Sequence, residues 1–67
     1  MPMQGGQMMF YAVAEIATGG MMYLGGSEVT AAEKLTPGRC YAKGQTEMEA
    51  RALCLIEVRK FQMRSKP

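Results

Sequence analysis

The sequence predicts an α+β fold: a three-stranded antiparallel sheet with one C-terminal helix packed on one face, in the order β-β-β-α. Two observations lead to this prediction. Short runs of strand-forming residues alternate with glycine-rich breaks as far as about residue 43, and a capping box then opens a long run of helix formers. Because 67 residues make a single domain, we expect a flexible lead-in over residues 1–7, one domain over 8–64 and a frayed C-terminus over 65–67.

The first predicted strand covers residues 8–17, which are rich in β-formers and are followed by Thr18, Gly19 and Gly20. The face that carries small alanines is expected to meet the helix, because small side chains let a helix approach closely. That face comprises Phe10, Ala12, Ala14 and Ile16, and the opposite face comprises Tyr11, Val13 and Glu15. The glycine pair favours a tight turn, so residues 21–24 are predicted to return as an antiparallel strand.

Residues 27–37 are predicted to form a connector that contains at most one helical turn, because Thr30 and Glu33 fit a capping box. The Pro37-Gly38 pair then signals a turn. Residues 39–43 form the predicted third strand, and its alternation gives two faces. Cys40 and Ala42 lie on one face, and Arg39, Tyr41 and Lys43 lie on the other.

The C-terminal helix is predicted to run from Glu47 to about Met63, with Thr46 as its cap and Glu49 completing the capping box. At 100° per residue the helix is apolar on two sides. The first stripe, expected to face the sheet, comprises Ala50, Leu53, Cys54, Val58 and Phe61. The second stripe, on the opposite side, comprises Met48, Ala52, Leu55, Ile56 and Met63. A helix that covers one small sheet needs one stripe, so the second is either ordinary surface or an interface.

The residue inventory argues against catalysis. The chain contains no histidine and no aspartate, and these are the most frequent acid–base groups together with paired carboxylates. Cys40 and Cys54 have no histidine to activate them, and two cysteines alone cannot complete a zinc site. We therefore expect a protein that is not an enzyme and that uses no cofactor and no metal.

Net charge and the presence or absence of targeting signals indicate which cellular compartment to expect. The net charge is +2, with −2 over residues 1–38 and +4 over residues 39–67, so the C-terminal part is the basic end. Residues 1–7 show neither the basic nor the apolar region of a signal peptide, and no apolar run approaches the ~20 residues of a membrane span. Two cysteines are too few for a secreted disulfide scaffold, so we expect reduced thiols and a cytoplasmic location.

Two segments resemble the HicB-like antitoxins. Residues 10–16 (FYAVAEI), with the glycine hairpin and the following strand, resemble the opening of that family. Residues 37–50 (PGRCYAKGQTEMEA) resemble its passage from third strand into helix. The resemblance implies a truncated RNase-H-like arrangement, a three-stranded sheet with a helix on one face. It also implies a protein that neutralises a small RNA-cleaving toxin by docking on it.

Two functional hypotheses follow. The first is a protein-binding module, antitoxin-like or a phage-type inhibitor in the manner of anti-CRISPR proteins. It would act as a homodimer or against a toxin, a host defence protein or a host regulatory protein. Its partner-binding residues would be Met48, Ala52, Leu55, Ile56 and Met63. The alternative is a nucleic-acid-binding protein with a basic, aromatic strand face. Its residues would be Arg39, Tyr41, Lys43, Arg59, Lys60 and Arg64, and the competing interpretation of this face is a solvated sheet surface.

Overall fold

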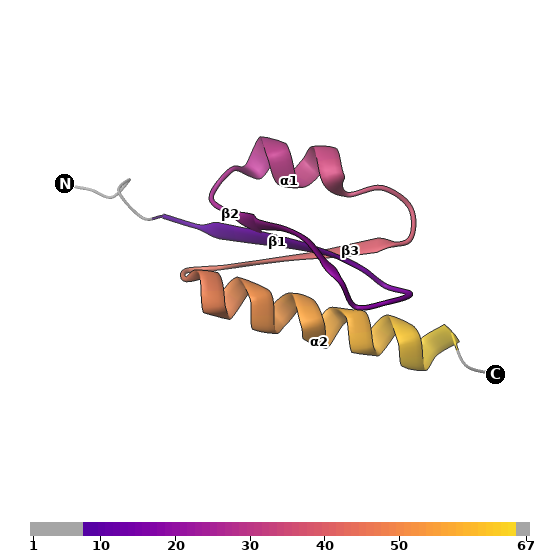
Figure 1. Ribbon diagram of the computed structural model, residues 1–67. Helices are drawn as coiled ribbons and strands as arrows, with labels where there is room; N and C mark the ends of the chain where they lie inside the picture. The colour runs from indigo at the N-terminus through magenta and orange to yellow at the C-terminus, as the bar shows by residue number, and fades with distance from the viewer. Residues whose placement is uncertain (1–7, 66–67) are drawn as a thin grey trace.

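The computed structural model describes residues 8–65 and has three layers, with one helix on each side of a three-stranded sheet (Figure 1). The elements are β1 (Phe10–Glu15), β2 (Met21–Gly25), α1 (Glu28–Lys34), β3 (Arg39–Gly44) and α2 (Glu47–Ser65). The predicted α+β class, the three-stranded antiparallel sheet and the C-terminal helix are confirmed. The predicted lead-in over 1–7 lies outside the described residues, as do 66–67, whereas residue 65 still belongs to α2.

Strand β1 is the centre of the sheet, because it pairs antiparallel with both neighbours in the order β2-β1-β3. The turn from β1 to β2 is longer than predicted, since β1 ends at Glu15 and β2 begins at Met21. The Gly19 amide donates to the Glu15 carbonyl oxygen at 2.7 Å, and the Glu15 amide donates to the Gly20 carbonyl oxygen at 2.9 Å. Of the two glycines only Gly19 takes a positive φ, of 75°. The turn takes up residues 16–20 because these two hydrogen bonds join Glu15 to Gly19 and Gly20.

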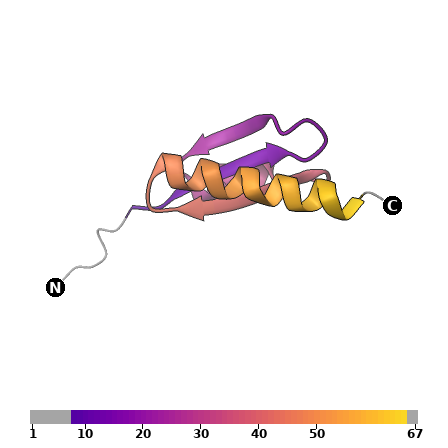
Figure 2. The ribbon, with the colours of Figure 1, turned by 90° about the horizontal axis from the view of Figure 1, so that it is seen from below.

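The face of the sheet that was predicted to meet the helix does so. Ala12 and Ala14 of β1 are fully buried, and they pair in register with Ala42 and Cys40 of β3 on the same face. Helix α2 lies lengthwise over this face (Figure 2). The core cluster beneath it comprises Ala12, Ala14, Cys40, Ala50, Cys54 and Val58. Because these side chains are small, the helix packs close to the strands.

The first stripe of α2 is buried only in part. Ala50, Cys54 and Val58 are buried, but Leu53 is 41% exposed and Phe61 is 38% exposed. A 19-residue helix is about 28 Å long, whereas a six-residue strand spans about 20 Å. The C-terminal turns of α2 therefore have less sheet beneath them than its first three turns.

Helix α1 forms the third layer, although the sequence predicted no more than a single helical turn in this connector. It spans seven residues, and Ser27 rather than Thr30 caps it, because the Ser27 hydroxyl accepts from the Thr30 amide at 3.1 Å. It packs on β1 and β2 across the sheet from α2 (Figure 1). Val13 on this face is fully buried, and Ala31 of α1 is only 1% exposed to solvent. The helix therefore gives the sheet a second, smaller apolar contact.

Candidate functional site

The side of α2 that points away from the sheet is apolar and uncovered by the described part of the chain. Met48 is 79% exposed, Met63 is 70% exposed and Ile56 is 50% exposed, which are high values for such large apolar side chains. Ala52 is also exposed, and Leu55 is half-buried. We call these five residues the outer face of α2: Met48, Ala52, Leu55, Ile56 and Met63. They are the residues predicted as partner-binding. The helix places Ala52, Ile56 and Met63 on the side opposite Cys54, and Met48 and half-buried Leu55 on the flank of that side.

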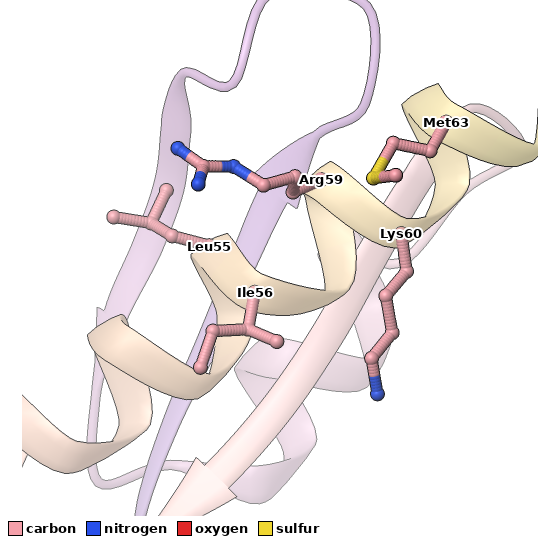
Figure 3. Close-up of a pocket in the computed structure, with 5 residues that line it drawn as sticks. All are labelled: Leu55, Ile56, Arg59, Lys60 and Met63. Carbon is pink, nitrogen blue, oxygen red and sulfur yellow. The ribbon is translucent and has the colours of Figure 1, made fainter.

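The C-terminal half of the outer face contains a shallow hollow of about 280 Å³. It is lined by Leu55, Ile56, Arg59, Lys60 and Met63 (Figure 3). Leu55 and Arg59 extend to one side of the helix, and Ile56 and Lys60 extend to the other (Figure 3). The hollow thus joins three of the predicted partner-binding residues to two residues that were assigned to the nucleic-acid alternative. The i+4 spacing that links Leu55 to Arg59 and Ile56 to Lys60 is the sequence signal for this grouping.

The charges on α2 are arranged by position along the helix. Glu47 and Glu49 lie in its first turn and Arg64 lies in its last, as the helix dipole favours. The Lys60 ammonium lies 3.5 Å from the Glu57 carboxylate, and both side chains are exposed. Such exposed pairs contribute little to stability. The Arg64 guanidinium lies 5.4 Å from the centre of the Phe61 ring. The first turn of α2 is therefore acidic and its last turn is basic.

The strand face proposed for nucleic acid lies on the other side of the molecule. Arg39, Tyr41 and Lys43 pair with Glu15, Val13 and Tyr11 on the sheet face that carries α1. The Tyr11 and Tyr41 rings stack with their centres 6.3 Å apart and their planes 10° apart.

Arg39 on this face is engaged within the fold. One of its guanidinium nitrogens donates to the Lys34 carbonyl oxygen at the end of α1, at 2.9 Å. Arg59, Lys60 and Arg64 belong to α2, across the sheet from this strand face. The fold therefore does not bring the six residues of the nucleic-acid alternative onto one surface.

Cys40 and Cys54 face each other between β3 and α2. Each thiol donates to the other residue's backbone carbonyl oxygen at a sulfur–oxygen distance of 3.7 Å. Burial raises the pKa of both thiols, and that of Cys54 to about 12. A thiol that stays protonated at neutral pH is a poor nucleophile and a poor metal ligand. Within residues 8–65 no three histidine, cysteine, aspartate or glutamate side chains gather as a metal site would require.

Comparison with known proteins adds no relative. No protein-family model, no curated protein and no solved structure matches this chain. Among the described helices, none combines the length and the apolar character needed to cross a membrane.

Proposed function

We propose that this chain is a non-enzymatic protein-binding module that docks on a partner protein through the outer face of α2. One observation carries the proposal: three large apolar side chains, Met48, Ile56 and Met63, are 50% or more exposed on the side of α2 that points away from the sheet. Exposed apolar patches of this kind mark interaction sites. Methionine suits such a surface, because its unbranched side chain adapts to the shape of a partner.

The proposed class is an antitoxin-like protein or a phage-type inhibitor, such as an anti-CRISPR protein. The HicB-like resemblance of residues 10–16 and 37–50 supports this class. The absence of histidine and aspartate from the sequence, and the raised pKa of both thiols, support binding over catalysis. We propose action in the cytoplasm, because two free buried cysteines suit a reducing compartment.

The test is affinity capture from cells of the source organism with the wild-type chain and two variants. Ile56→Glu places a charge in the middle of the outer face of α2. Val29→Glu is the matched control, because Val29 is 69% exposed but lies on α1, across the sheet. We expect a partner protein that the wild type and Val29→Glu retain and that Ile56→Glu loses. Equal retention by all three proteins would contradict docking through this face, provided that circular dichroism shows them equally folded.

A second candidate function is nucleic-acid binding through the sheet face that carries α1. The observation that favours it is the Tyr11–Tyr41 stack, which has exposed Lys43 directly opposite Tyr11 in the register. Aromatic rings beside cations bind single-stranded nucleic acid by stacking and phosphate contact. The test is titration with a fluorescent single-stranded oligonucleotide at two salt concentrations. Affinity that falls steeply with salt, and that Tyr41→Ala removes, would support this function; no binding at low salt would exclude it.

A further inference from the structure

The hollow on the outer face of α2 has the geometry of a receptor for a side chain from another helix. Four of its lining residues, Ile56, Arg59, Lys60 and Met63, stand at i, i+3, i+4 and i+7. In packed helix pairs, a side chain of one helix inserts into a hole formed by four residues of the facing helix. Figure 3 shows Arg59 on one side of this space and Ile56 and Lys60 on the other. The hollow is therefore open toward a helix laid along α2.

The same helix carries a side chain suited to fill such a hollow. Met48, at 79%, is the most exposed of the large apolar side chains in the described part of the chain. It is unbranched and flexible, so it fits a shallow and partly polar space. It cannot reach the hollow of its own helix, because Ile56 lies eight residues, or about 12 Å, further along the axis. A second copy would bring Met48 to it.

We infer that two copies of this chain pair through antiparallel α2 helices, with Met48 of each copy seated in the hollow of the other. The inference rests on the proposed function, since it names the partner at the same face. Seating Met48 between Arg59 and Lys60 of the second copy puts the twofold axis at the level of Cys54. The same axis sets Ala52 against Ile56 of the second copy. A small residue at this level lets the two helices approach closely.

Charge complementarity selects the antiparallel orientation. Glu49 and Lys60 lie on the same flank of the outer face, eleven positions apart along the helix. The axis that seats Met48 also brings Glu49 of one copy beside Lys60 of the other, twice by symmetry. Within residues 8–65, the one ion pair of the Lys60 ammonium is with the Glu57 carboxylate at 3.5 Å, and both side chains are exposed. A parallel pair would instead leave Glu49 and Lys60 eleven residues apart along the pair and would align the two helix dipoles.

The first experiment measures the mass of the purified full-length chain by sedimentation equilibrium over a range of concentrations. We expect a dimer for the wild type and for Val29→Glu. We expect Ile56→Glu and Met48→Glu to raise the dissociation constant roughly ten-fold or more each. A wild type that stays monomeric at every concentration would overturn the inference, and so would a dimer that both outer-face variants leave unchanged.

The second experiment reads the orientation by disulfide cross-linking under mild oxidation. A mixture of Met48→Cys and Lys60→Cys chains should form a cross-linked dimer. Met48→Cys alone should not, because its two copies would stand roughly 18 Å apart along the pair. Wild type is the control for the buried Cys40 and Cys54. Efficient self-linking of Met48→Cys would establish a parallel pair and overturn the antiparallel arrangement.

The two proposals fail in distinguishable ways. A monomeric chain that still captures a different protein through Ile56 would overturn self-pairing and leave the proposed function standing. A dimer with the expected cross-links that captures no other protein would support self-pairing and overturn docking on a toxin or host protein.

Discussion

Gly44 is the last residue of β3, and the beginning of α2 packs so closely against it that a side chain would not fit. A Cβ atom at this position would lie 2.8 Å from the Ala50 backbone nitrogen and 2.8 Å from Cγ of Glu49. Real Cβ contacts are longer, and the Ala50 nitrogen belongs to the first turns of α2. Gly44 therefore lets the beginning of the helix fold back over the end of β3.

Gly44→Ala is expected to lower the free energy of unfolding by about 1–3 kcal/mol, because the added methyl group overpacks a site that backbone atoms define. Gly26→Ala is the control. Its added Cβ would meet nothing closer than the Met9 carbonyl oxygen at 3.7 Å, an ordinary contact. Urea unfolding of the two variants measures the difference, and equal stabilities would refute this account of Gly44.

The Cys54 thiol makes the stability of the fold depend on pH in the alkaline range. Burial raises its pKa from 9.0 to about 12, so the folded state holds the proton more tightly than the unfolded chain. The stabilisation is therefore complete below pH 9 and is lost as the pH rises from 9 toward 12. We expect the urea midpoint of the wild type to fall more steeply over this range than that of Cys54→Ala. Parallel curves for the two proteins would argue against the role of this thiol.

At the scale of the element, α1 shows how a capping residue sets where a helix begins. Ser27 and Thr30 both precede helix-forming residues, and the pattern at Thr30 matches a capping box in the sequence. The helix nevertheless begins at Glu28, with the Ser27 hydroxyl accepting from the Thr30 amide. The Tyr23 hydroxyl accepts from the Ser27 amide at 3.0 Å, which ties the cap to β2. Thr30 then lies within the first turn of the helix.

Ser27→Ala is therefore expected to lower the free energy of unfolding by roughly 0.5–2 kcal/mol. Thr30→Ala is expected to change it by about 0.5 kcal/mol or less, because Thr30 contributes its backbone amide to the cap and alanine keeps that amide. Thermal unfolding of both variants checks the order. A larger loss for Thr30→Ala would show that the cap lies at Thr30 instead.

At the scale of the whole molecule, the small core of this short chain gives a reason for its exposed apolar outer face to be covered by a partner. A domain of this size buries only about 60% of its unfolded surface, so its own core leaves it marginally stable. The core under α2 is built mainly of alanine and cysteine, which bury little area each. Covering Met48, Ile56 and Met63 with a second copy would add apolar burial that the single chain lacks.

The unfolding temperature of the wild type is accordingly expected to rise with protein concentration, because association stabilises the folded state by mass action. Ile56→Glu should unfold at a temperature that does not depend on concentration. Differential scanning calorimetry over a hundred-fold range of concentration makes the comparison. A wild-type unfolding temperature that stays constant over this range would show that pairing through α2 does not stabilise the fold.

Prediction from the sequence succeeded where the signals are local. The alternation of Phe10–Glu15 identified the face that meets α2, and the capping box at Thr46 located the start of that helix, where the Thr46 hydroxyl accepts from the Glu49 amide at 3.0 Å. Prediction fell short for α1, because Ser27 and Thr30 are both acceptable caps and only packing against β1 and β2 distinguishes them. It also did not separate Leu53 from Cys54, which are neighbours on the helix but differ in burial.

The sequence alone determined the strands, the long helix and the presence of two apolar stripes on it, since each depends on residues close together in the chain. Only the tertiary structure decided which charged residues share a surface. The sheet separates Arg39 and Lys43 from Arg59 and Lys60, and it leaves Arg59 and Lys60 beside Ile56 and Met63 around one hollow. The physical reason is that one sheet has two faces. A residue's neighbours across space depend on which layer covers each face, and that is settled by long-range packing.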